Sequence, residues 1–280
     1  MKILHVIATP RGDHSQTLPF SRAFLGHLAK VRPDLTVQEL DLSTTTLPTI
    51  DDTIASTKYR LMQGLPVDRD AARTWPFVEA LIEDFVSADL CLITTPMWNF
   101  GLPHQLKHWI DCIIQPGYTF SFEGGYPSPL VQGTSMVCIT SRGSDYSPSG
   151  PMGAYDFQEP YLRAIFGFIG VTDSEFVHAQ PLDHPVLREQ AHADAMEAVE
   201  KLASAPRWAA SKCASSEKDA SASAASGPSR PAIPDATTGS PAAVNTKPTA
   251  TDSTNATTWL RATADIAHAM ARYPPAIRKL

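Results

Sequence analysis

The sequence lacks any long hydrophobic run. None of its apolar stretches approaches the roughly 20 residues that a membrane-spanning helix needs, so we expect a protein without a membrane span. The apolar stretch near the N-terminus, residues 3–8, is short, and Thr9, Pro10 and Arg11 close it without a small-residue cleavage pattern. This pattern favours a β-strand over a signal peptide.

An excess of positive charge is also absent. The 280 residues carry 23 Lys and Arg against 29 Asp and Glu, a formal net charge of -6. Nucleic-acid binding requires a broad basic surface that neutralises phosphates, so no nucleic-acid partner is expected. The four cysteines contain no C-x-x-C pair. Cysteines so far apart are typical of reduced, structural thiols and predict a cytoplasmic protein.

Several catalytic sequences are missing. There is no G-x-G-x-x-G, no Walker A sequence and no G-x-S-x-G, so a dinucleotide would be a visiting substrate and an esterase elbow is unsupported. His104 and His108 have the spacing of a zinc motif. The residues between them lack a general-base Glu and no third ligand is evident, so no metal site is predicted.

Residues 1–204 alternate between strand-like and helix-like patterns. The run at residues 89–95 is almost wholly apolar, as in a strand covered on both faces. Five strands separated by helices predict a three-layer α/β domain, with a parallel sheet and right-handed crossovers. The strands are expected at residues 2–8, 36–42, 89–95, 135–140 and 175–179. The helices are expected at residues 18–31, 54–62, 160–168 and 185–204, and after Thr74 and Pro103.

The composition changes after residue 204. Residues 205–257 are dominated by Ala, Ser, Thr and Pro, with Trp208 as their only aromatic residue. Such a segment cannot bury enough apolar surface to offset chain entropy, which predicts a disordered linker. A helical pattern returns in residues 258–272, so residues 258–280 are expected to form a short C-terminal helix and tail.

Three unusual loops follow strands one, three and four. In an open parallel sheet, ligands bind outside the carboxyl ends of the strands. The first loop, residues 9–17, carries the hydroxyls of Thr9, Ser15 and Thr17 and leads into a helix N-terminus, which attracts anions. This composition suits a phosphate site, but taken alone it is more typical of a polar loop with an N-cap.

The second loop, residues 95–101, places Met97, Trp98 and Phe100 directly after a buried strand. These side chains are costly to leave in water. They would either line a slot for a flat ring, with Asn99 and backbone amides at its polar edge, or form a tucked corner of the core. The third loop, residues 141–146, would complete the far side. Together the loops describe a phosphate site and a planar-ring site, as flavin mononucleotide (FMN) requires.

These motifs resemble those of a known family. Residues 96–100 (P-M-W-N-F) and 105–107 (Q-L-K) closely resemble the P-M-Y-N-F and Q-L-K stretch of the FMN-dependent NADH azoreductases, a family that includes NADH:quinone oxidoreductases. The resemblance covers roughly residues 1–204. Other hallmarks occur in the family's order at residues 117–120, 140–143, 160–162 and 166–170.

The resemblance implies a flavodoxin-like fold with strand order 2-1-3-4-5, a homodimer and non-covalent FMN. It implies that hydride passes from NADH to the flavin and then, by a ping-pong mechanism, to a quinone or an azo compound. No protein acid or base is required, so no catalytic residue is nominated. The first loop would hold the phosphate, and the other two would contact the ring. The implied cofactor-binding residues are Thr9, Ser15, Gln16, Thr17, Met97, Trp98, Asn99, Phe100, Ser141, Arg142, Gly143 and Ser144.

The sequence departs from the family pattern at four positions. Thr9 and Thr17 stand where Ser is common and keep the hydroxyl, whereas Trp98 replaces Tyr and loses a phenolic donor. Ser144 replaces a common Gly, which bears on substrate preference. Two alternatives stay open: a flavin-binding electron carrier without its own turnover, and a phosphoester hydrolase that uses the first loop. Arg142, in the third loop, is interpreted as a loop or surface charge and not as a catalytic group.

Overall fold

The computed structural model describes residues 1–122 and 125–209. Its main sheet has five parallel strands in the order β2-β1-β3-β6-β7. Counted along the chain, these five strands give the predicted order 2-1-3-4-5, which confirms the predicted topology. The sheet strands are β1 (Lys2–Ile7), β2 (Thr36–Asp41), β3 (Leu90–Pro96), β6 (Ser135–Ser141) and β7 (Ser174–Ala179). A small antiparallel pair is formed by β4 (Phe120–Ser121) and β5 (Ser128–Pro129).

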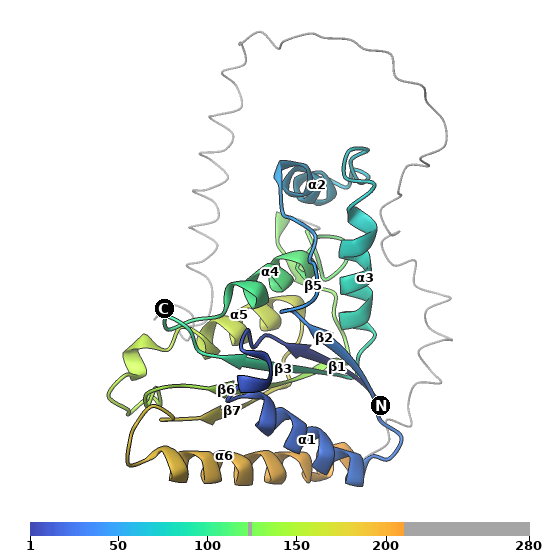
Figure 1. The fold of residues 1–280 in the computed structure, drawn as a ribbon. Helices are drawn as coiled ribbons and strands as arrows, with labels where there is room; N and C mark the ends of the chain where they lie inside the picture. Colours follow the sequence, from blue (N-terminus) through green and yellow to red (C-terminus); the bar gives the residue numbers. More distant parts are fainter. Residues whose placement is uncertain (123–124, 210–280) are drawn as a thin grey trace. The chain divides into compact units, whose positions relative to one another are not determined.

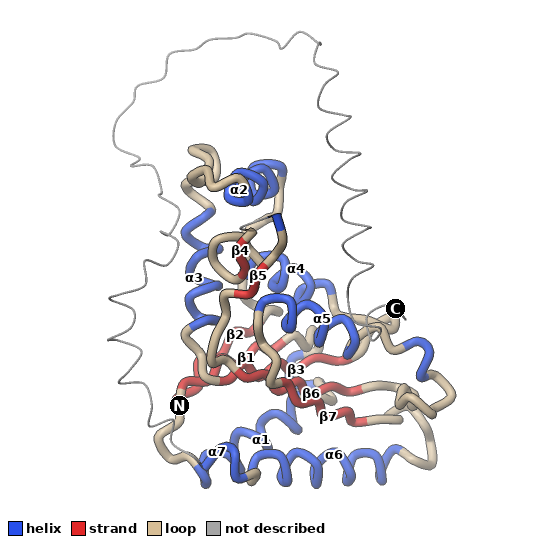
Figure 2. The backbone as a smooth tube through the Cα atoms, turned by 180° about the vertical axis from the view of Figure 1, so that it is seen from behind, coloured by secondary structure: helices blue, strands red, loops and turns tan. Residues whose placement is uncertain are grey.

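Helices cover both faces of the sheet, and this gives the predicted three layers (Figures 1 and 2). One face is covered by α1 (Leu18–Val31), α6 (Arg188–Ala203) and α7 (Pro206–Ala209). The other face is covered by α3 (Trp75–Val86), α4 (His104–Ile113) and α5 (Glu159–Ile169), and α2 (Asp52–Met62) packs into the same core. In the described residues, no helix has both the length and the apolar character needed to cross a bilayer.

The strands are nearly continuous in apolar residues because each face of the sheet meets a separate core. On β1, Leu4 and Val6 enter the core beneath α3, α4 and α5, whereas Ile3 enters the core beneath α1 and α6. In the first core the rings of Phe85 and Trp109 meet edge to face, with centroids 6.0 Å apart. These two cores fix the sheet and hold its strand ends in register.

Two apolar side chains with helical spacing to buried residues point outward. Phe77 is 66% exposed because it lies outside the buried face of α3, which consists of Trp75, Val78, Leu81, Ile82 and Phe85. Leu187 is 47% exposed because it precedes the first turn of α6. Thr74 stands at the predicted start of α3, but its backbone is helical and its side chain makes no cap bond, whereas a capping residue normally has extended dihedrals.

The folded part of the chain continues past the predicted boundary at residue 204. Helix α7 lies in the first residues of the predicted linker, and Trp208 within it is buried. Its indole Nε1 donates to the Leu202 carbonyl at 2.7 Å, and its ring meets Phe24 edge-on. The linker is therefore not disordered over its first five residues. The rest of the predicted linker and the predicted C-terminal helix lie outside the described residues.

His5 is a fully buried histidine inside the sheet. Its Nε2 lies 2.8 Å from Thr94 Oγ1, which also hydrogen-bonds to Ser21 Oγ of α1. Burial lowers the pKa of His5, against an opposing effect of Glu39 on β2. The folded state therefore binds a proton less readily than the unfolded chain. The contribution of neutral His5 to the free energy of unfolding is fully present above the unfolded pKa of about 6.5. This contribution is lost as pH falls through the folded pKa.

We expect the substitution His5→Gln to remove part of the acid sensitivity of folding. Urea unfolding at pH 7.5 and 5.5 measures this, since one such group contributes a slope of at most about 1.4 kcal/mol per pH unit. The control is His27→Gln, because His27 lies partly exposed on α1. If both variants keep the slope of the parent chain, His5 does not carry the pH dependence.

Candidate functional site

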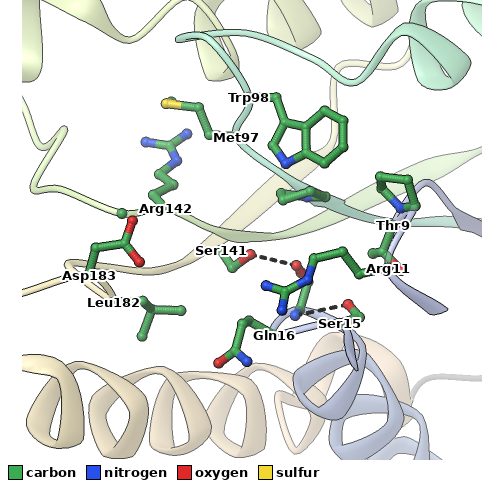
Figure 3. A pocket seen from close by; sticks show the side chains of 14 residues that line it. Thr9, Arg11, Ser15, Gln16, Met97, Trp98, Ser141, Arg142, Leu182 and Asp183 are labelled. Carbon is green, nitrogen blue, oxygen red and sulfur yellow. Dashed lines mark hydrogen bonds between the residues drawn. The ribbon is translucent and has the colours of Figure 1, made fainter. Parts of the chain in front are cut away.

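The three loops meet around one hollow at the carboxyl ends of β1, β3 and β6 (Figure 3). This convergence was predicted from the sequence, and the structure confirms it. The lining residues are Thr9, Pro10, Arg11, Ser15, Gln16, Thr17, Pro96, Met97, Trp98, Ser141, Arg142, Gly143, Leu182 and Asp183. Asn99, Phe100 and Ser144 are not part of this wall, so their contacts with a ligand stay predictions.

The first loop begins α1 with an unusual cap. After a short 3-10 turn, Ser15 Oγ accepts hydrogen bonds from Thr17 N at 3.2 Å and Leu18 N at 3.1 Å. Ser15 thus caps the helix, while Thr17 stands at the N-cap position without a capping bond. The capping interpretation is correct for Ser15, yet its hydroxyl hydrogen remains available to donate into the hollow.

Thr9 carries a second hydroxyl of the first loop. Its Oγ1 is buried and has no hydrogen-bond partner among the residues that the structure describes. Leaving a buried hydroxyl unpaired costs about 1–3 kcal/mol. The Thr9 hydroxyl in the wall of the hollow is therefore available to hydrogen-bond to a ligand that carries oxygen atoms.

Gln16 and Arg11 extend this polar wall. The Gln16 carbonyl oxygen accepts a hydrogen bond from Arg188 of α6 at 3.2 Å, which leaves its amide group to donate. Figure 3 shows the exposed Arg11 side chain extending across the hollow from the first loop. The Arg11 carbonyl accepts the N–H of His14 at 3.0 Å, whereas the Arg11 guanidinium makes no hydrogen bond or ion pair within residues 1–122 and 125–209. A free guanidinium beside a helix N-terminus is suited to bind an anion such as a phosphate.

The second loop turns back in two residues. Trp98 N donates to Gly101 O at 3.1 Å, and Gly101 N donates to Trp98 O at 2.9 Å. Between them Asn99 and Phe100 have φ angles of 47° and 68°, as in the turn that usually contains Asn-Gly. The turn leaves Met97 and Trp98 in the wall, with the indole of Trp98 at the edge of the hollow (Figure 3).

Phe100 is strained in this turn. A left-handed backbone costs an ordinary residue about 1–2 kcal/mol, and Gly is the usual choice. The ring of Phe100 packs against Tyr155 and Tyr146, with centroids 5.2 Å and 6.4 Å away. Its carbonyl accepts the N–H of Phe157 at 3.1 Å. These contacts hold the turn in a conformation that its sequence disfavours.

The third loop is fastened to the loop after β7. Leu182 N donates to Arg142 O at 2.9 Å, and Asp183 N donates to Gly143 O at 3.0 Å. A Cβ atom on Gly143 would come within 2.2 Å of Asp183 Oδ2. The missing side chain of Gly143 thus allows the Asp183 carboxylate to approach the backbone. Leu182 and Asp183 carry no sequence motif, so sequence reasoning missed them.

The position of Arg142 differs from the prediction. Its side chain is 1% exposed and pairs with Asp156, with Nη1 and Oδ2 2.9 Å apart. Arg142 does lie in the loop after β6, as expected, but its interpretation as a surface charge is wrong. The sequence could not reveal this burial, because Asp156 lies in an irregular segment before α5 whose path no periodic pattern sets.

Residues 1–203 match a protein family that is described by its flavodoxin-like fold. The chain belongs to this family. FMN-dependent NADH:quinone oxidoreductase 2 of Trichormus variabilis is 37% identical over 199 residues, which cover 70% of this chain and 95% of that protein. The FMN-dependent NADH:quinone oxidoreductase of Nitratidesulfovibrio vulgaris is 36% identical over 204 residues, 72% of this chain and 97% of that protein.

A solved flavodoxin-like structure gives the same picture. An FMN-dependent NADH-azoreductase from Bacillus anthracis in complex with FMN is 25% identical, with a TM-score of 0.66. The match covers 75% of this chain and all of that protein. The resemblance to azoreductases and quinone oxidoreductases is thus confirmed, and the chain is an oxidoreductase of the flavodoxin-like family.

The strain at Phe100 can be measured with two variants that lose the same ring. Phe100→Ala and Phe100→Gly both remove the packing against Tyr155, but only Gly adopts a left-handed backbone freely. We expect Phe100→Gly to be more stable than Phe100→Ala by about 1 kcal/mol in urea unfolding. Equal stabilities would show that the turn is not strained.

Proposed function

We propose that this flavodoxin-like enzyme binds FMN non-covalently in the hollow and transfers two electrons from NADH to a quinone or an azo compound. The observation that carries the proposal is that the Thr9 hydroxyl and the Arg11 guanidinium both line the hollow and that neither has a side-chain partner among the described residues. Both lie in the loop before α1, where the helix dipole also favours negative charge. A phosphate monoester satisfies the hydroxyl and neutralises the arginine.

The residues of the wall fit the rest of such a ligand. The amides of Met97 and Trp98 are engaged with Ser141 O and Gly101 O. The amides of Asn99 and Phe100 make no hydrogen bond within the described residues, so they are available to the polar edge of a flat ring. This gives the second loop a role through its backbone, although the Asn99 and Phe100 side chains lie outside the wall.

The protein's part in the reaction is to bind and orient. Bound FMN supplies the hydride acceptor and donor of the proposed ping-pong exchange. Trp98 is 41% exposed at the edge of the hollow, where it offers a face for a flat substrate to stack on. No side chain of the wall is assigned as an acid or base, since solvent at the open hollow supplies protons.

We also propose a homodimer, as the resemblance to the azoreductase family implies. Phe100, Tyr155 and Phe157 are exposed aromatic residues of one connected cluster. Exposed apolar patches of this kind often mark protein interfaces. Light scattering of the purified chain gives the mass, and a monomer at micromolar concentration would contradict this part of the proposal.

The proposed function predicts a yellow protein whose colour responds to substrates. Under anaerobic conditions, NADH should bleach the flavin absorption and a quinone should restore it. A colourless protein that does not bind added FMN would contradict the proposed function. A yellow chain that NADH fails to bleach would instead point to an electron carrier that needs a protein donor.

The role of Arg11 predicts a selective loss of affinity. Arg11→Gln should weaken binding of FMN about tenfold or more, because a charge-assisted bond to a phosphate contributes about 1.5–3 kcal/mol. Binding of riboflavin, which has no phosphate, should change little. Flavin fluorescence titration measures both, and Arg69→Gln, at an exposed arginine between α2 and α3, is the control. Equal losses for both flavins would place Arg11 away from the phosphate.

A further inference from the structure

Arg142 is the centre of a buried polar cluster behind the hollow. Besides its ion pair with Asp156, its Nε lies 3.2 Å from both Thr140 Oγ1 and Gln158 Oε1. In Figure 3 the side chain rises away from Asp183, which lies on the opposite side of its backbone. The guanidinium is therefore held by protein groups, whereas that of Arg11 extends across the hollow.

Gln158 transmits the position of Arg142 to the second loop. Gln158 is fully buried, and while its Oε1 accepts from Arg142, its Nε2 donates to the Pro96 carbonyl at 2.9 Å. Pro96 has no N–H, so this carbonyl is its only backbone group that can form a hydrogen bond. Thr95 Oγ1 also donates to it, at 3.2 Å. One amide group thus joins the end of β6 to the end of β3.

Asp156 fixes the other side of the cluster. Its Oδ2 pairs with Arg142, and its Oδ1 accepts the N–H groups of Gln158 and Glu159 at 3.0 Å and 3.1 Å. The same carboxylate therefore holds both the guanidinium and the start of α5. Since Gln158 is held at its backbone and at its side chain, its amide has little freedom to move.

The cluster is not explained by stability alone. Arg142 Nη2 is buried and has no hydrogen-bond partner among the described residues. An unpaired buried N–H lowers stability, and a well-packed apolar group in place of a buried ion pair is often neutral or stabilising. The cluster therefore calls for a role other than stability. Through Gln158, Arg142 is connected to the loop that begins at Pro96.

We infer that Arg142 is a positioning residue for the cofactor. Through Gln158 it sets the position of Pro96, and so the separation between the loop after β3 and the loop after β6. The backbone bond from Met97 N to Ser141 O, 2.9 Å long, is the second link across the same gap. The inference rests on the proposed function, in which these two loops lie on either side of the flavin ring.

The decisive variant is Gln158→Glu, which keeps the size of the side chain and its acceptor for Arg142. Ionised beside Arg142, the new carboxylate has no hydrogen to donate to Pro96. We expect the urea midpoint of the apoprotein to stay near that of the parent chain. The dissociation constants of FMN and riboflavin should both rise about tenfold, and the absorption maximum of bound FMN should shift. The parallel loss distinguishes this variant from Arg11→Gln.

Two further variants keep the test decisive. Arg142→Lys retains the charge opposite Asp156 but not the planar fork, so it should weaken both flavins in the same way and carries the test if Gln158→Glu does not fold. Arg163→Lys is the control, at a half-exposed arginine of α5 that pairs with Glu159. It should leave both affinities and the spectrum unchanged.

The outcomes separate the two proposals. If the parent chain binds no FMN, the proposed function fails whatever the variants do. If the parent chain binds FMN, and Gln158→Glu and Arg142→Lys bind it with parental affinity and spectrum, the positioning role is wrong while the proposed function stands. A loss of affinity in Arg163→Lys equal to that in Arg142→Lys would also overturn the inference.

Discussion

Ser141 holds the site together, because it bonds to both of the other loops. Its carbonyl accepts the N–H of Met97 at 2.9 Å, and its hydroxyl lies 2.6 Å from that of Thr17. The first contact prolongs the parallel ladder between β3 and β6, in which Pro96 faces Ser141. The second reaches from the central sheet to the start of α1. Ser141, at the end of β6, thus links the loop after β3 and the loop after β1 around the hollow.

The sequence predicts most of this fold because the sheet is buried on both faces. An apolar run such as residues 90–95 fits a central strand and little else. Because the strands are parallel, the loops that follow them then lie at the same edge of the sheet. The errors lie where tertiary contacts decide. Phe77 has helical spacing with Leu81 and Phe85, which are buried, yet Phe77 itself lies outside the buried face of α3. Trp208 sits in a segment of low hydrophobicity, but its indole packs against Phe24 while Arg207 pairs with Asp173 and Glu175, and these contacts extend the domain.

In the site, too, the sequence predicts what local pattern sets and misses what tertiary contacts set. The hydroxyls and aromatic residues of the three loops are recognisable because they interrupt the apolar runs of the strands before them. Arg11 lies in the same loop but is harder to recognise from the sequence, because hydroxyls at a helix N-terminus already account for an anion site without it. Asp183 was beyond reach, since its place beside Gly143 follows from the path of the loop after β7. The burial of Arg142 likewise depends on Asp156, fourteen residues along the chain.

The turn at Asn99 and Phe100 ties the site to a distant part of the sequence. The backbone of Phe100 keeps its unusual shape because Tyr155 and Phe157, more than fifty residues downstream, hold its ring and its carbonyl. Residues outside the wall of the hollow thereby hold the turn whose two amides the proposed function assigns to the flavin ring. As the family diverges, changes in the segment before α5 can alter what the hollow accepts while every residue of its wall stays the same.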